Sequence, residues 1–351
     1  MSIVIDDKKI TDINISNKNV QKIVDILTNK IIFEKTKPVS NEYFYIENTY
    51  NGSNTISLKT TKGSGNITGS HATQLQYSKD KETWKTITLS GTNTIPMNSG
   101  ERVYFRNDSG SFNWYRNSRD RFYTQIKCSK NHKVGGNINS LLDYNNYNVA
   151  ITPYCFYVLF YENKYLTDAS ELIFSKTSLE WSCCQNMFYG CTSLTTAPKL
   201  PATTLASRCY YGMFDGCTSL TTAPKLPATT LAINCYYSMF SSCTSLTTAP
   251  TLPATTLASN CYQCMFYGCT SLTTAPALPA KTLVEYCYQS MFYGCTSLNN
   301  VTVYADDISA TDCTSYWLSN VASSGTFRNL GSVIYPTGVS GIPSGWTEVK
   351  N

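Results

Sequence analysis

The sequence predicts a mostly β protein with short helical turns, in which an N-terminal β module and a β-sandwich precede a solenoid of stacked repeats. The first observation is a 26-residue unit, written almost identically from Cys191, Cys217, Cys243 and Cys269. Self-similarity at a fixed period of about 20 to 50 residues is the sequence signature of a solenoid. The second observation is the alternation of apolar and polar residues between turn residues over residues 41–145, which is typical of short strands.

These patterns divide the chain into four parts. We expect a β module over residues 1–38, a β-sandwich over residues 39–148, about six 26-residue units over residues 149–300 and a C-terminal cap over residues 301–351. The chain has 351 residues with 42% hydrophobic and 15% charged side chains, so it is long enough for several domains and apolar enough to be globular.

The N-terminal part carries two short apolar motifs about ten residues apart. Ile10-x-x-Ile13 is echoed by Val20-x-x-Ile23, and this period favours short strands joined by polar turns. The alternative is a helix over Val20–Ile31, because several apolar residues in that interval also lie at helical spacing.

The second part has strand-like alternation in segments such as 84–89 and 102–105, with Gly-rich turns between them. It also carries most of the excess of positive over negative charge. Arg116, Arg119 and Arg121 stand near three aromatic residues, and this group is a candidate for docking a partner or an acidic glycan. The alternative is an ordinary solvated loop.

The repeat unit cannot bury enough apolar surface to fold alone, so successive copies must stack. Stacking places identical residues in columns, including one column of leucines from Leu194 and another from Leu205. Prolines such as Pro198 confine backbone pairing to a short stretch around Leu194–Ala197. We expect a short helix or helical turn over Ser207–Phe214. Terminal repeats are usually atypical, and the copy around Cys155 is degenerate while the pattern stops after Leu298.

The chain has fifteen cysteines, and ten of them recur with the 26-residue period and form two columns. We interpret both columns as structural thiols, because small buried thiols pack well and donate weak hydrogen bonds. The columns contain Cys183, Cys209, Cys235, Cys261 and Cys287, and Cys191, Cys217, Cys243, Cys269 and Cys295. Disulfides and a metal site are the alternatives. Only Cys261-x-x-Cys264 has zinc-like spacing, and it has no second pair, so we expect no metal and no cofactor.

Charge and motifs argue against several classes of function. The net charge of +5 comes without any basic run, which argues against nucleic-acid binding. The first residues contain charged side chains where an export signal needs an apolar core, so we expect no secretory signal and a reducing compartment. His71 and His132 lie in no catalytic motif, and we expect both to be exposed. We therefore expect no catalytic residues and no enzyme.

Positions that differ between near-identical copies are expected to be exposed, because packing fixes the others. Tyrosine recurs at these positions, and exposed tyrosine offers rigid, amphipathic contact area. The candidate binding residues are Tyr189, Arg208, Tyr211, Tyr237, Tyr267 and Tyr293, together with Arg116 and Arg119. The alternative is that these are tolerated changes on an inert surface.

The pattern Cys-x-x-Leu, Leu-Pro and Cys-Tyr-x-x-Met-Phe-x-Gly-Cys resembles the BspA-like, treponemal-type leucine-rich repeats. Met-Phe stands here where that family has Ala-Phe, and the unit is longer than the family's usual one. The version with LPATTLA and CYxxMFYGCTSL is similar to proteins of gut bacteria and their phages. The likeness extends more weakly to residues 76–101 and 341–346, and the Ile-x-x-Ile module resembles β-repeats at the start of phage tail and fibre proteins.

This resemblance implies a leucine-rich-repeat solenoid with a role in adhesion and host attachment. The expected protein is a non-enzymatic phage virion structural protein, a head or tail fibre-like appendage, that is assembled in the host cytoplasm and located in the virion. Its expected partners are other virion proteins at the N-terminal module and a host surface protein or glycan at the repeats. A homo-oligomer, a trimer in many fibres, is also implied, although no coiled-coil heptad is present. The alternative is a BspA-like adhesin on a bacterial cell surface.

Overall fold

The computed structural model describes residues 22–25, 30–34, 43–62, 74–107, 112–115 and 121–350. These residues are mostly β, which confirms the predicted class at that level. The only helical element among them is the 3₁₀ turn η1 (Ile138–Leu141). None of their helices is long and apolar enough to cross a membrane. The chain separates into two compact units, Met1–Asn41 and Glu42–Asn351.

The described residues of the first unit form an antiparallel pair of strands. Strand β1 (Lys22–Asp25) pairs with β2 (Lys30–Glu34), with Lys22 opposite Glu34 and a register shift between Ile23 and Val24. The described part of the interval that also fitted a helix is therefore strand.

The second unit begins with two β-sheets. The four-stranded sheet has the order β7-β4-β10-β9, and the six-stranded sheet has the order β12-β11-β3-β8-β5-β6. Pairing is antiparallel except between β11 and β12, which are parallel. The strands are β3 (Phe44–Asn48), β4 (Asn54–Lys62), β5 (Gln74–Ser78), β6 (Lys85–Thr88), β7 (Thr92–Met97), β8 (Arg102–Arg106), β9 (Trp114–Tyr115), β10 (Arg121–Cys128), β11 (His132–Asn137) and β12 (Leu166–Ile173).

The two sheets bury alternate side chains in one common core. Ile56 and Ile126 enter it from the four-stranded sheet, and Phe44, Phe105 and Val134 enter it from the six-stranded sheet. The same hydrophobic cluster continues without a break into the repeats. The predicted boundary between residues 148 and 149 therefore lies within one continuous core.

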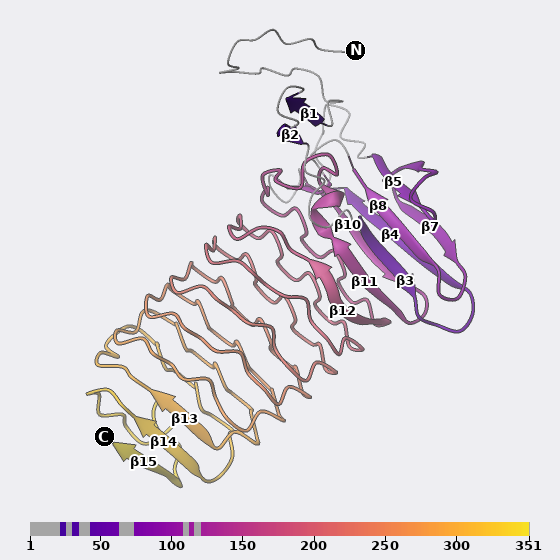
Figure 1. Cartoon of the computed structure of the whole chain (residues 1–351). Helices are drawn as coiled ribbons and strands as arrows, with labels where there is room; N and C mark the ends of the chain where they lie inside the picture. The colour runs from indigo at the N-terminus through magenta and orange to yellow at the C-terminus, as the bar shows by residue number, and fades with distance from the viewer. Residues whose placement is uncertain are drawn as a thin grey trace. The chain divides into compact units, whose positions relative to one another are not determined.

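Beyond β12 the repeat copies lie side by side as successive coils, down to β13 near the C-terminus (Figure 1). Each copy contains a run of consecutive β-turns, which we call the turn run; in one copy it covers residues 206–217. Its backbone N–H groups alternate between two acceptors. Cys209 N donates to Ala206 O at 3.3 Å within the copy, whereas Tyr210 N donates to Cys235 O of the next copy at 3.1 Å.

A left-handed residue at every fourth position produces this alternation. The φ angles are 58° at Arg208, 57° at Gly212 and 74° at Gly216, and the same three positions are left-handed in the other copies. A positive φ at the third residue of a turn defines the type II geometry and cannot continue an α-helix. The helix or helical turn predicted over Ser207–Phe214 is therefore wrong.

The inward side chains of the turn runs form what we call the interior columns. Cys209, Met213, Phe214 and Cys217 have no solvent exposure, and their equivalents in the other copies are also buried. Phenylalanine rings stack from copy to copy, with Phe214 and Phe240 5.6 Å apart and inclined by 1°. A further column of leucines, which the sequence analysis does not predict, is also buried. It consists of the leucines that precede proline, namely Leu200, Leu226, Leu252 and Leu278.

The first and last copies adapt the pattern to their neighbours. In the first copy Asp168 bridges Thr196 while Ser178 bridges Thr204, so its two additional residues lie between Asp168 and Ser178, where β12 is extended. After Leu298 the sequence pattern stops, but one more coil follows. Tyr316 repeats the left-handed geometry 26 residues after Ser290.

This last coil is closed by a small parallel sheet of order β13-β14-β15. Its strands are β13 (Asn300–Val303), β14 (Gly325–Asn329) and β15 (Trp346–Lys350). The fully buried Trp317 stacks on Tyr288 of the preceding copy at 6.4 Å and on Tyr335 at 5.7 Å. The aromatic packing of the repeats therefore continues into the region predicted as a cap.

Candidate functional site

The outward side chains of the turn runs form a surface that we call the turn face. In each copy this face has two positions four residues apart, such as Tyr211 and Asp215. Buried residues such as Cys209 and Met213 alternate with them along the chain. Each position continues as a column from copy to copy. The first column is Tyr157, Gln185, Tyr211, Tyr237, Gln263 and Gln289, and the second is Tyr161, Tyr189, Asp215, Ser241, Tyr267 and Tyr293.

Tyrosines on the turn face stack in parallel pairs. Tyr211 and Tyr237 have ring centroids 4.6 Å apart and planes inclined by 3°. In the second column, Tyr161 and Tyr189 are separated by 4.8 Å, and Tyr267 and Tyr293 by 4.9 Å. Such stacking holds the rings in place, because stacked aromatic pairs gain about 1 kcal/mol beyond the energy of buried area.

The structure brings most of the predicted binding residues together on this one face. Tyr189, Tyr211, Tyr237, Tyr267 and Tyr293 all belong to it. Tyr267 is exposed, at 40%, whereas the other four are half-buried, so the expectation that these positions are exposed is only partly correct. Arg208 is exposed as well. Burial raises the pKa of Tyr211, and the positive charge of Arg208 opposes this only in part. Arg116 and Arg119 lie outside the described residues.

Asp215 stands between two tyrosine pairs in the second column. Burial raises the pKa of its carboxyl to about 6, against the lowering effect of a hydrogen bond with Ser241. Within the described ranges, no Lys, Arg or His nitrogen lies within ion-pair distance of Asp215. Asp215 is not among the binding residues predicted from the sequence, although it is the only acid in this column.

An aromatic cluster at the N-terminal end of the turn face was also missed. Tyr123 of β10 contacts Tyr157 edge-on at 5.3 Å, and Tyr154 contacts Trp181 edge-on at 5.0 Å. Trp181 is 42% exposed. The only signal was that the degenerate copies carry aromatic residues where later copies carry polar ones.

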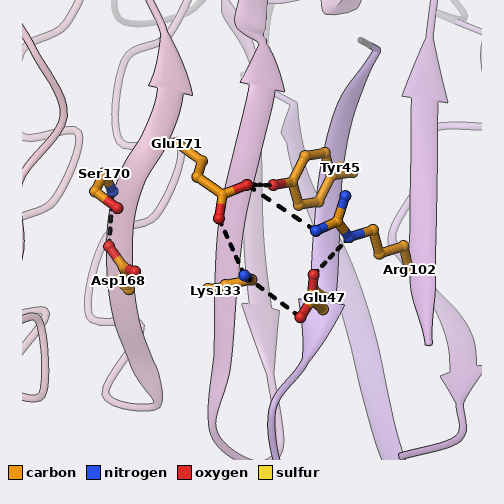
Figure 2. Close-up of polar contacts among 7 residues, drawn as sticks. All are labelled: Tyr45, Glu47, Arg102, Lys133, Asp168, Ser170 and Glu171. Carbon is orange, nitrogen blue, oxygen red and sulfur yellow. Dashed lines mark hydrogen bonds and ion pairs between the residues drawn. The ribbon is translucent and has the colours of Figure 1, made fainter. Parts of the chain in front are cut away.

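A second polar site lies on the six-stranded sheet (Figure 2). Glu171 of β12 accepts hydrogen bonds from the Tyr45 hydroxyl and from Lys133 Nζ, which is 3.1 Å away. Arg102 Nε donates to Glu47 at 2.5 Å, and Lys133 also lies 3.5 Å from Glu47. The hydrogen bond from Tyr45, followed by that from Lys133, holds the pKa of Glu171 below its ordinary value. Two acids and two bases balance one another, as expected for a network that joins strands.

A surface hollow of about 450 Å³ adjoins this network. It is lined by β12 from Ser170 to Phe174 and by Lys199 and Pro201 of the next copy. Glu171 and Lys199 place opposite charges on it, and Ile173 adds an apolar surface that is 37% exposed. A smaller hollow of about 210 Å³ lies between proline-rich segments around Pro250 and Pro276.

His132 is fully buried, so the prediction that it is exposed is wrong. Its Nδ1 lies 3.0 Å from Lys130 O and its Nε2 lies 3.0 Å from Asn163 Nδ2. The carbonyl requires a proton on Nδ1, so Nε2 accepts from the amide and the ring is neutral. Burial lowers the pKa of His132 to about 4. The pairing with Asn163 of the first copy could not be seen from sequence, and His71 lies outside the described residues.

The cysteine columns lie inside the repeats. All ten column thiols are buried, and none is in a disulfide. In the second column each Sγ donates to a phenylalanine carbonyl of an earlier copy, for example Cys217 to Phe188 O at 3.2 Å. Asn163 occupies the equivalent position in the first copy and donates to Ile126 O of β10 at 3.1 Å. Among the described residues, no group of three or more His, Cys, Asp or Glu side chains is placed to hold a metal ion.

Comparison with known proteins yields no relative: no protein-family model, no curated protein and no solved structure matches this chain.

Proposed function

We propose that this chain is a non-enzymatic structural protein of a phage virion, a head or tail fibre-like appendage. In this proposal, the repeats form a leucine-rich-repeat solenoid whose turn face binds a host-cell protein or glycan. Residues 1–38 attach the chain to other virion proteins, and the β-sandwich separates this attachment from the binding surface. The residues proposed for binding are those of the turn face, above all Tyr189, Tyr211, Tyr237 and Tyr267.

The observation that carries the proposal is the division between interior columns and turn face. The interior columns repeat the same residue from copy to copy, because each side chain packs on its counterpart above and below. The turn face instead changes from tyrosine to glutamine, aspartate or serine. A rigid support with a varied, tyrosine-rich surface suits recognition of a partner.

The thiols support assembly in a reducing compartment such as the host cytoplasm. Burial raises the pKa of Cys235 and Cys295 to about 12, so these thiols are protonated and unreactive at neutral pH. A protein that folds in the cytoplasm can keep such thiols reduced.

The test is to locate the chain in purified virions of a phage whose genome encodes it. We expect its peptides in the virion by mass spectrometry and antibody-bound gold on an appendage by electron microscopy. Virions that lack both signals contradict the proposal. Detection on the surface of uninfected bacteria would instead support an adhesin, and cleavage of a host glycan by the purified chain would contradict a non-enzymatic role.

A further inference from the structure

The second column of the turn face is interrupted at its centre. Backbone hydrogen bonds give the order of the copies: Gly190 N donates to Asp215 O at 2.7 Å, Gly216 N to Ser241 O at 2.8 Å, and Ser242 N to Tyr267 O at 2.6 Å. Tyr189 and Tyr267 are therefore separated by three steps between copies. At about 4.8 Å for each hydrogen-bonded step, the span is about 14 Å.

The side chains within this interval are much shorter than tyrosine. Asp215 and Ser241 occupy it, and Ser241 is itself buried. The pairs that Tyr189 forms with Tyr161 and Tyr267 forms with Tyr293 each cover one ring face. Their other faces are turned toward the copies that carry Asp215 and Ser241, and within the described part of the chain the next residue of the column on that side is not aromatic.

The chemistry of the interval is that of a saccharide site. Apolar C–H faces of a sugar pack on aromatic rings, while a carboxylate accepts hydrogen bonds from its hydroxyl groups. The adjoining Tyr211–Tyr237 stack supplies further hydroxyl groups from the first column of the same two copies. A partly buried carboxylate without a cationic partner disfavours a second negative charge beside it.

The carboxylate of Asp215 is partly buried without an ion pair among the described residues, which lowers the stability of the fold, and the packing of the repeat does not require an acid at this position. Other copies carry tyrosine or serine at this position, so the repeat does not require a carboxylate. Asp215 is half-buried and has no ion pair within the described part of the chain. Within the fold the carboxylate has the hydrogen bond with Ser241, and a ligand with hydroxyl groups would add further donors.

We infer that Asp215 and Ser241, between Tyr189 and Tyr267, form a subsite for a neutral, hydroxyl-rich glycan and exclude sialylated or uronic-acid glycans. This inference rests on the proposed function and gives its ligand a chemical class. Tyr189 and Tyr267 stack on sugar rings, and Asp215 binds sugar hydroxyl groups. A short oligosaccharide fits the span between the two tyrosines.

The experiment applies the full chain to a printed array of neutral hexose and N-acetylhexosamine oligosaccharides beside sialylated and uronic-acid oligosaccharides. We expect binding to neutral glycans only. Asp215→Asn and Tyr189→Ala should each weaken it by about tenfold or more, because charge-assisted hydrogen bonds and ring stacking each contribute that much. The matched control is Tyr316→Ala, an exposed tyrosine of the last coil that should bind like the wild type.

Binding to acidic glycans only, or Asp215→Asn binding as strongly as wild type, overturns the inference. No array binding by a chain that does bind host cells also overturns it and leaves the proposed function standing. Absence from virions together with neutral-glycan binding that requires Asp215 has the opposite meaning: the subsite holds and the virion role fails. Thermal unfolding of each variant distinguishes lost binding from lost folding.

Discussion

The paired sheets and the repeat copies satisfy their backbone hydrogen bonds in different ways. Strand β10 pairs with β4 over seven consecutive residues, and its side chains alternate between the core and the opposite face. In a turn run, by contrast, the backbone N–H of one residue donates to a carbonyl of the same copy, and the N–H of the next residue donates to a carbonyl of the following copy. In the sheets any apolar residue of suitable size serves at an inward position. In the repeats each inward side chain packs on its own counterpart, so the residues of the interior columns hardly change, whereas those of the turn face do.

The largest expected effect comes from breaking an interior column. Phe214→Ala removes a fully buried ring that stacks on Phe188 and Phe240, so the free energy of unfolding should fall by about 3–5 kcal/mol. Tyr237→Ala, on the turn face of the same array, should cost about 1 kcal/mol or less. Urea titration followed by circular dichroism measures both. Equal losses for the two variants would remove the distinction between interior and turn face.

The next effect concerns the junction between sheet and repeats at His132. Burial lowers the pKa of His132 to about 4 from an ordinary 6.5, so the unfolded chain binds the extra proton between those values. Stability should therefore be complete above about pH 6.5 and should fall as the pH drops toward 4, by about 3 kcal/mol in all. Unfolding measured across this range tests it, with His132→Gln as the variant that loses this pH dependence. An unchanged slope in that variant would assign the loss to other groups.

A smaller effect should distinguish two left-handed glycines of the turn runs. Both Gly212→Ala and Gly268→Ala place a side chain at positive φ, near 57° and 69°. Only at Gly212 does the added Cβ collide with the Asn186 amide oxygen; at Gly268 the nearest atom is 3.9 Å away. We expect Gly212→Ala to lose about 1–2 kcal/mol more than Gly268→Ala. Equal melting temperatures would mean that Asn186 moves aside freely.

The smallest effect is a gain in stability at Asp215. Its pKa is raised to about 6 from an ordinary 3.8, so the fold disfavours the charged form above that range. Asp215→Asn should therefore raise stability at pH 7 by on the order of 1 kcal/mol, after allowance for partial exposure, and the gain should disappear below about pH 4. Thermal unfolding at both pH values measures it. A loss of stability at pH 7 would give Asp215 a structural role instead.

The features that follow from residue identity alone could be predicted from the sequence. The invariant Cys, Met and Phe positions lie inside the repeats, and the copy-variable tyrosines lie on one face. The turn runs could not be predicted, because their left-handed positions are mostly occupied by residues such as Arg208, Asn234 and Tyr286 rather than glycine.

Junctions were the other source of error. His132 is buried because Asn163, where later copies carry cysteine, reaches across to β11. The last coil was hard to see because, of the Cys-x-x-x-Met-Phe positions, it keeps only the cysteine: Cys313, Trp317 and Leu318 stand 26 residues after Cys287, Met291 and Phe292. Both features depend on contacts between segments that the repeat period alone does not describe.

We propose that the turn face makes the contacts with a partner and that the interior columns only hold this face in place. The most direct measurement is the affinity of the purified full chain for host cells, with and without Tyr211→Ala combined with Tyr237→Ala. We predict at least about a tenfold loss of binding with an unchanged fold, because a central aromatic pair contributes disproportionately to an interface. Host-cell binding that survives the loss of both rings would contradict this account.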